Sequence, residues 1–167
     1  STDESTSNTL KFAIGHQILN QLQERQFSSR EFIGIATATA QAAYALFELN
    51  EDLSLGEEAI RISRVLVNQK PRIVEILILN AQIEMQLGDL QVALSRWKTI
   101  SSGSKRGSLQ WLQARFNTIS ILSLDSPDEA IAVLDQHEIL YPNYGVEPYG
   151  SKLKNLHFQL KKGQNGT

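Results

Sequence analysis

A small residue returns at nearly regular intervals along this chain, inside segments whose apolar residues have helical spacing. The three positions are Ala59, Ala93 and Ala130, separated by intervals of 34 and 37 residues. A proline, Pro71 or Pro142, follows the first and third of these alanines after twelve residues. A period of this length is the signature of stacked repeats, whose units cannot bury their apolar faces alone. The chain is therefore constrained to an array of similar elements.

The elements of this array are predicted to be helices. Leu10, Ile14 and Ile18 form an apolar stripe at intervals of four residues, and similar spacing continues as far as Leu160. This is the period of one face of an α-helix, and no segment shows the sustained alternation of a strand. We expect roughly eight helices in antiparallel pairs with short loops.

Local signals predict where several helices begin and end. Residues 28–31 and 54–57 have the spacing of a capping box, with Ser28 and Ser54 as the N-cap residues. Gly88 is predicted to end a helix in the left-handed conformation, and Asp89 to open the next one. Residues 126–129 (SPDE) are predicted to restart a helix with the serine as N-cap.

Composition restricts the class of function. The 167 residues carry 16 lysines and arginines against 18 aspartates and glutamates, a net charge of −2. Nucleic-acid-binding domains usually have a basic face, so we expect no nucleic-acid partner. The absence of cysteine excludes disulfides and thiolate chemistry. No run approaches the roughly 18 apolar residues of a spanning helix, so no membrane insertion is expected, and both cytoplasmic and exported locations stay open.

The repeat resembles the tetratricopeptide repeat, a two-helix unit of about 34 residues. The middle unit carries the fullest match, with Ala81 in its first helix and with Ala93 and Trp97 in its second. The turn between those helices is Gly-Asp-Leu at residues 88–90, where the family has Gly-Asp-Tyr. The third unit keeps Ala130, Leu134 and Pro142, and the first keeps Ala59 and Pro71.

The match also departs from the family pattern. The small residue of the first helix is replaced by Phe47 in the first unit and by Thr118 in the third. The repeats are therefore degenerate. The register nevertheless places Ala93 at a helix crossing and Ala36 outside the aligned positions, so Ala93→Leu is expected to be more destabilising than Ala36→Leu.

The resemblance implies an all-α, right-handed solenoid of antiparallel helix pairs, closed by a C-terminal capping helix. We expect one domain over residues 9–160, flanked by disordered tails. The predicted ranges are the tail at 1–8, repeats at about 40–73, 74–107 and 111–144, the cap at 151–160 and the tail at 161–167.

The resemblance also implies that the first helix of each pair lines a concave groove for a partner protein. The family's Lys/Asn clamp for a peptide carboxylate is missing, and Arg115 is the only cation among the groove positions. A groove for a helical or extended segment is therefore expected, and a receptor for chaperone tails is disfavoured. The predicted groove residues are Tyr44, Glu48, Ile78, Gln82, Met85, Arg115, Ile119 and Leu122.

No residue pattern predicts catalysis or a metal site. His16, His137 and His157 lack ligand spacing, and the chain has neither a nucleophile elbow nor a phosphate-binding glycine loop. The basic segment at 101–108 (SSGSKRGS) is interpreted as a solvated loop, with an anion site at the next helix as the alternative. Three tyrosines within residues 141–149 are interpreted as a staple for the cap, with a partner-binding knob as the alternative.

The sequence therefore predicts a protein-interaction module or scaffold that is not an enzyme and has no cofactor. Its partner is expected to be another protein or peptide. The alternative is a helical accessory domain of a larger enzyme, sensor or envelope-associated protein whose active part lies outside this chain.

Overall fold

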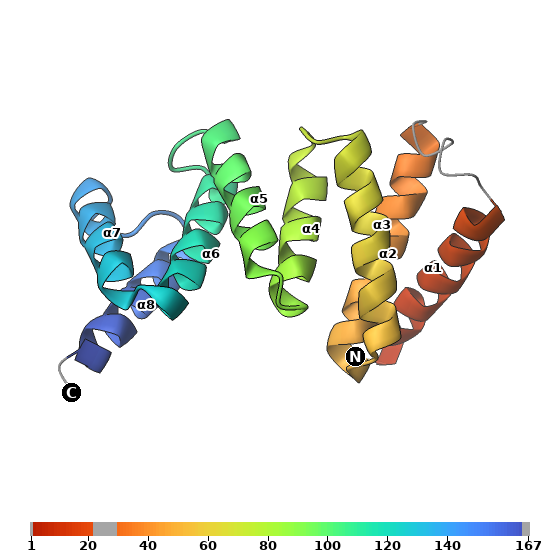
Figure 1. Cartoon of the computed structure of the whole chain (residues 1–167), viewed down its shortest axis with the longest axis horizontal. Helices are drawn as coiled ribbons and strands as arrows, with labels where there is room; N and C mark the ends of the chain where they lie inside the picture. Colours follow the sequence, from red (N-terminus) through yellow and green to blue (C-terminus); the bar gives the residue numbers. More distant parts are fainter. Residues whose placement is uncertain (1, 22–29, 165–167) are drawn as a thin grey trace. The chain divides into compact units, whose positions relative to one another are not determined.

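The computed structural model describes residues 2–21 and 30–164, and over these ranges it contains helices and no strand (Figure 1). The all-helical fold class is thereby confirmed, as is the expected number of about eight helices. The described helices are α1 Thr2–Gln21, α2 Arg30–Asn50, α3 Leu53–Gln69, α4 Val74–Gln86, α5 Leu90–Gly103, α6 Leu109–Asp125, α7 Pro127–Leu140 and α8 Tyr149–Gln164.

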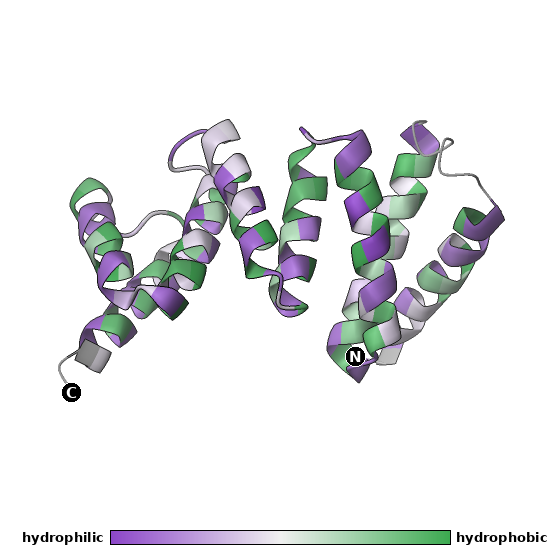
Figure 2. Cartoon of the chain, in the orientation of Figure 1, coloured by the Kyte–Doolittle hydropathy of each residue, from purple (hydrophilic) through white to green (hydrophobic). Residues whose placement is uncertain are grey.

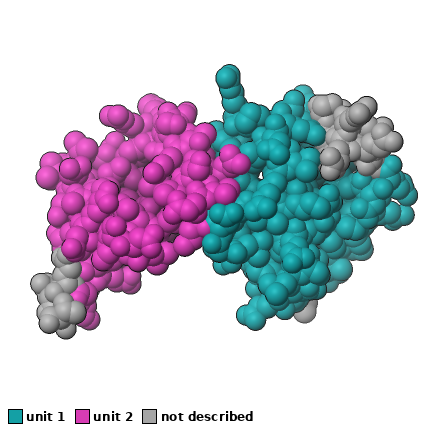
Figure 3. Space-filling model, viewed as in Figure 1, with its two compact units in different colours: residues 1–89 teal, residues 90–167 magenta. Residues whose placement is uncertain are grey.

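The chain divides into two compact units, residues 1–89 with α1–α4 and residues 90–167 with α5–α8 (Figure 3). The single domain expected from the sequence stays a prediction. The boundary between the two units falls inside the predicted middle repeat, so its two helices, α4 and α5, belong to different units. The stacking of three repeats into one solenoid stays a prediction.

Unit 1 is built around α2, which packs against both α1 and α3, while α4 packs against α3. Small residues allow the close approach of α1 and α2. A Cβ atom added to Gly15 of α1 would collide with the Thr39 hydroxyl of α2, and that hydroxyl donates to the Ile35 carbonyl oxygen at 2.8 Å. Ala36, Ala40 and Ala43 of α2 are also buried. Because these residues have small side chains or none, the backbones of neighbouring helices can approach closely.

Of the described helices, α2 is long and apolar enough to cross a membrane by the criteria of length and composition. The sequence shows no long apolar run here, because threonine, glycine and glutamine interrupt the apolar residues. The stretch from Phe32 to Phe47 is nevertheless uncharged. In the structure α2 lies between α1 and α3 with six buried residues. A core helix of this kind satisfies the same two criteria.

The start of α3 differs from the prediction. Asp52, not Ser54, is the N-cap residue, and its Oδ1 accepts the Ser54 backbone N–H at 3.0 Å and the Ser54 hydroxyl at 2.7 Å. An aspartate side chain bonds the backbone two residues on more strongly than serine does, which explains the shift. The other predicted capping box has its Ser28 N-cap outside the described residues.

The predicted end of α4 is confirmed. Gly88 has φ = +88°, and the Asp89 N–H donates to the Glu84 carbonyl oxygen at 3.0 Å. This six-residue closure is the Schellman arrangement, which leaves the glycine at the position where a side chain would strain the backbone. Ser126 and Pro127 also take their predicted places at the start of α7, although the Ser126 side chain makes no capping hydrogen bond.

Three predicted loop or tail segments are partly helical. α5 continues to Gly103 and Ser108 caps α6 by accepting the Trp111 N–H at 3.3 Å, so only the middle of the segment 101–108 is a loop. The predicted tails also shorten, because α1 begins at Thr2 and α8 continues to Gln164. Apolar spacing cannot reveal such ends, since their residues bury little surface.

Unit 2 is built around α6, which packs against α5, α7 and α8. α8 packs against both α6 and α7 (Figure 1). Individual helices carry both hydrophobic and hydrophilic residues, as amphipathic packing requires (Figure 2). The buried core contains Trp111, Leu112, Ile119, Ala130, Leu134, Tyr144 and Leu153.

Tyr144 attaches the α7–α8 connection to this core. Its side chain is 5% exposed, its backbone has φ = +59°, and its hydroxyl lies 2.7 Å from His157 Nδ1 on α8. Burial raises the pKa of Tyr144 to about 12, and the Glu138 carboxylate acts in the same direction. For Tyr144 the interpretation as a staple is therefore confirmed.

The repeat register predicts that Ala93 is more tightly packed than Ala36. Both alanines are in fact 0% exposed, so burial does not distinguish their leucine variants. A clean contrast lies on α7, where Ala130 is buried and Ala132 is exposed. Ala130→Leu is expected to lower the free energy of unfolding by about 1–3 kcal/mol, since added methylenes overpack the core. Ala132→Leu should change it by less than about 0.5 kcal/mol. Urea unfolding of both variants checks this, and equal losses would contradict the assigned packing.

Candidate functional site

The largest described cavity, of about 1020 Å³, lies in unit 2 among α5, α6 and α7. We call it the α5–α7 cavity. Most of the lining residues on each helix are three or four positions apart, which is the spacing of one helix face. The lining residues are Leu94, Lys98, Ser101, Ser102, Ser104, Arg106, Trp111, Arg115, Thr118, Ile119, Leu122, Glu129, Val133, Gln136, Leu140 and Tyr141.

Arg115 is the half-buried cation of this cavity. Its Nε–H donates to His137 Nδ1 at 2.9 Å, and one terminal nitrogen donates to the Val133 carbonyl oxygen at 3.4 Å. The guanidinium carbon lies 5.3 Å from the centre of the Trp111 ring. Among the described residues no carboxylate forms an ion pair with it. Burial lowers the pKa of Arg115, yet an arginine stays charged at neutral pH, so the cavity contains an uncompensated positive charge.

The partner of Arg115, His137, is fully buried and bonded through both ring nitrogens. Its Nε2 lies 3.0 Å from the Tyr144 carbonyl oxygen, so Nε2 must carry the proton and Nδ1 must accept from Arg115. Burial lowers the pKa of His137; the hydrogen bond to the Tyr144 carbonyl opposes this effect, and the Arg115 charge adds to it. His137 thus holds the guanidinium in place as a neutral acceptor.

The stability of unit 2 is expected to fall as the pH drops through the range where an unfolded histidine takes up a proton. The ordinary pKa is 6.5 and the folded value is lower, so the unfolded state binds more protons in this range and is stabilised relative to the folded state. Carboxyl groups titrate mostly below this range. His137→Gln should lessen the difference in unfolding free energy between about pH 7.5 and about pH 5.5. The check is urea unfolding at both pH values; an unchanged difference would assign the effect to other groups.

Further polar groups line the same cavity. Lys98 and Arg106 are exposed at it, and Glu129 is the one carboxylate among its lining residues. The Thr118 hydroxyl is buried and has no hydrogen-bond partner. Arg106 comes from the basic segment that was interpreted as a solvated loop. The cavity therefore combines three cations, one acid and several uncharged polar side chains with apolar ones.

The structure separates the predicted groove residues into two sets. Arg115, Ile119 and Leu122 line the α5–α7 cavity, but Ile119 is only 1% exposed and belongs mainly to the core. The other five residues lie in unit 1 and are Tyr44, Glu48, Ile78, Gln82 and Met85.

The unit 1 residues are only partly brought together. Tyr44, Ile78 and Gln82 line a cavity of about 300 Å³ between α2 and α4. Glu48 is exposed beside it and accepts a hydrogen bond from Gln86 at 3.4 Å, and Met85 does not line it. Burial raises the pKa of the Tyr44 hydroxyl, and Glu48 reinforces the effect. This small site has no cation among its lining residues.

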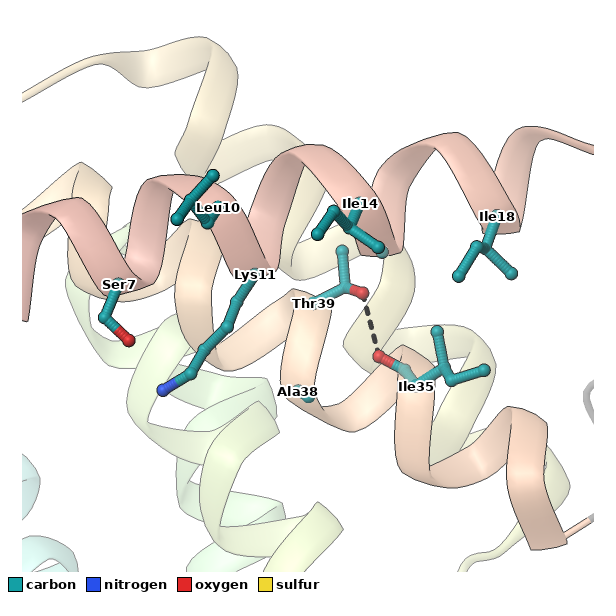
Figure 4. A pocket seen from close by; sticks show the side chains of 9 residues that line it. Ser7, Leu10, Lys11, Ile14, Ile18, Ile35, Ala38 and Thr39 are labelled. Atoms are coloured by element: carbon teal, nitrogen blue, oxygen red, sulfur yellow. Dashed lines mark hydrogen bonds between the residues drawn. The ribbon is translucent and has the colours of Figure 1, made fainter.

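A third cavity, of about 360 Å³, lies between α1 and α2. Its walls are apolar, and Figure 4 shows Ile14 and Ile18 of α1 facing Ile35 and Thr39 of α2. Leu10 and Ile14 are more than half exposed there. The stripe on the first helix was predicted from the sequence, but nothing in the structure shows what covers it.

Sequence spacing missed a cluster of three side chains of the types that can ligate a metal, Asp135, Glu138 and His157, whose potential ligand atoms lie within 4.8 Å of one another. The cluster joins α7 to α8, so its residues are too distant in sequence to form a local motif. His157 Nε2 lies 3.0 Å from Asp135 Oδ1, and the Lys161 amine lies 2.7 Å from the same oxygen. With Tyr144 at the other ring nitrogen, the contacts form a network that attaches α8 to unit 2.

The signals for the other missed residues are also non-local. Trp111 near the start of α6 and Tyr141 after the end of α7 both line the cavity, and their ring centres lie 5.6 Å apart although thirty residues separate them.

Comparisons with protein-family models, with curated proteins and with solved structures gave no match.

Proposed function

We propose that this chain is a module that binds another protein, and that unit 2 receives a helical or extended segment of that partner in the α5–α7 cavity. The observation that supports the proposal is the Arg115 charge, which has no ion-pair partner among the described residues, in a cavity of about 1020 Å³ lined by both polar and apolar side chains. Binding sites commonly combine apolar walls with a few placed polar groups. A peptide segment fits that combination because it offers both kinds of side chain.

The helical architecture supports the proposal in a second way. Within each unit consecutive helices pack against one another, as they do in arrays of helical repeats. Such arrays use the faces of successive helices as binding surfaces. The right-handed stacking of tetratricopeptide-like pairs is part of the proposal.

The proposal is tested by selecting peptides from a random display library on the purified chain. Gln136 is exposed and lines the cavity, so Gln136→Trp should obstruct it without disturbing the core. Asn155→Trp is the matched control, because Asn155 is equally exposed but lies on α8, outside the cavity lining. Enriched peptides are expected to bind the wild type and Asn155→Trp, and to lose binding to Gln136→Trp.

Two results count against the proposal. One is a selection that enriches no sequence relative to a bare surface. The other is a set of enriched peptides that bind Gln136→Trp as tightly as the wild type, which places their site elsewhere.

A further inference from the structure

The charge on Arg115 is the feature of the α5–α7 cavity that its own neighbours leave unbalanced. A guanidinium has five N–H donors, and two nitrogens of Arg115 have a described acceptor, one on His137 and one on Val133. Neither acceptor is charged, because His137 is a neutral imidazole and Val133 contributes a backbone carbonyl. The remaining donors can take a carboxylate, whose two oxygens match the planar fork.

The surroundings of Arg115 strengthen its preference for an anion. Lys98 and Arg106 line the same cavity, and Glu129 is the single opposing charge among its lining residues. The lining therefore carries a net charge of +2. A half-buried cation interacts with an opposite charge more strongly than an exposed one, because less water screens it.

The walls determine what else the occupant must carry. Trp111 and Tyr141 present aromatic faces, and Leu94, Leu122 and Val133 present aliphatic ones. A free anion such as phosphate would leave these walls exposed to water, whereas an acidic residue flanked by apolar side chains would cover them.

We infer that the segment bound in the α5–α7 cavity is acidic: an aspartate or glutamate carboxylate of the partner pairs with the Arg115 guanidinium, and apolar side chains beside it contact the walls. This inference rests on the proposed function, because it names the chemistry of the partner at the same site. Arg115 is its anchor, and Lys98 and Arg106 attract the same negative charge from the rim.

The test uses the display library selected on the wild-type chain and then measures the affinity of the enriched peptides. Enriched sequences are expected to share an aspartate or glutamate next to apolar residues. Arg115→Met keeps an unbranched side chain but removes the guanidinium that lies over Trp111, so it should weaken binding by at least roughly tenfold, the usual loss for a charged hydrogen bond. Replacing the partner's acidic residue by its amide should have the same effect on the wild type and little effect on Arg115→Met.

A second variant covers the case in which Arg115→Met does not fold. Lys98→Glu with Arg106→Glu reverses two exposed charges without touching the contacts of Arg115. It should weaken acidic peptides severalfold, mostly through slower association. Lys154→Glu, an exposed change on α8, is the control and should leave the affinity unchanged.

The outcomes separate this inference from the proposed function. Enriched peptides that lack acidic residues, or that bind folded Arg115→Met within twofold of the wild type, overturn the acidic anchor but leave peptide binding intact. A selection without enrichment refutes both. Titration with inorganic phosphate and with acetate supplies the last arm: Arg115-dependent phosphate binding without any acidic peptide would identify the occupant as a small anion and overturn the inference.

Discussion

Replacing Arg64 by methionine is expected to lower the free energy of unfolding by about 3 kcal/mol, because the substitution leaves a buried carboxylate without its cation. Arg64 of α3 donates two hydrogen bonds to Glu84 of α4, from Nε to Oε1 at 2.8 Å and from a terminal nitrogen to Oε2 at 2.9 Å. The Glu84 side chain is 0% exposed, whereas that of Arg64 is 51% exposed. Broken buried pairs commonly cost about 3–5 kcal/mol, and the access of water to Arg64 favours the lower end.

The network around Glu84 explains why the loss is not repaired locally. Asn80 donates to Ser63 at 3.0 Å and more distantly to Glu84 at 3.5 Å, so one long hydrogen bond is the described side-chain contact left to the carboxylate. An amide dipole does not compensate a full charge in an apolar environment. The pair therefore joins α3 to α4 through a contact that depends on both residues.

Arg61→Met is the matched control for this prediction. Arg61 lies three residues earlier on α3 and binds Glu58 at 2.7 Å, but this is a surface pair within one helix, worth less than about 1 kcal/mol. The double variant Arg64→Met with Glu84→Met should recover most of the lost stability, since buried pairs often tolerate apolar replacement. Urea unfolding followed by circular dichroism measures all three. Similar losses of stability for Arg61→Met and Arg64→Met would show that the ion pair between Arg64 and Glu84 is not buried in solution.

Gly145→Ala is expected to lower the free energy of unfolding by about 2–4 kcal/mol, the sum of a backbone cost and an overpacking cost. Gly145 has φ = +103°, a conformation that side chains rarely adopt. An added Cβ atom would also lie 2.8 Å from two side-chain carbons of Leu112, which is itself fully buried. The collision would displace the α7–α8 connection from the core of unit 2.

Gly107→Ala separates the two costs. Gly107 also has a positive φ, +79°, but an added Cβ atom would meet its nearest neighbour, Tyr141, at an ordinary 3.6 Å. This variant should lose only the backbone cost of about 1 kcal/mol. The measurement is urea unfolding of both variants, and equal losses would show that Leu112 moves aside without cost.

The parts of the fold that sequence reasoning predicts well depend on neighbours along the chain. Gly88 ends α4 and Pro127 opens α7 because backbone conformation alone demands those residue types. Helical spacing likewise identified the helices themselves. The cap of α3 shows the limit of such signals: Ser54 was predicted and Asp52 is observed, because both residues offer an acceptor and the aspartate is the stronger one.

The parts that escaped prediction depend on residues distant in sequence. Nothing near Arg64 indicates that its partner is Glu84, twenty residues away, and nothing near His157 indicates Asp135 on another helix. The division after Asp89 escaped for a related reason: the middle repeat is the best match to the family pattern, yet the unit boundary falls within it. The periodicity of apolar residues indicates which residues share a helix face. It does not indicate which helices pack together in one compact unit.

The candidate site shows both outcomes. Arg115 was predicted as the lone cation of the groove positions, and it does face a cavity together with Leu122. Ile119, at the same helical interval, is core instead, because α6 contacts three other helices and has little free face. Lys98, Arg106 and Tyr141 come from outside the expected groove helices, so no repeat register would have found them.

The positions of the two tryptophans make one half of the chain optically distinct from the other. Trp97 and Trp111 are the only tryptophans in the sequence, and both belong to unit 2. Light absorbed selectively by indole therefore yields emission from α5 and α6, while α1–α4 stay dark. Trp97 is fully buried, whereas the Trp111 ring lies against the Arg115 guanidinium. A carboxylate that binds Arg115 would change the electric field at that ring, so the Trp111 part of the emission is expected to change when the proposed ligand binds.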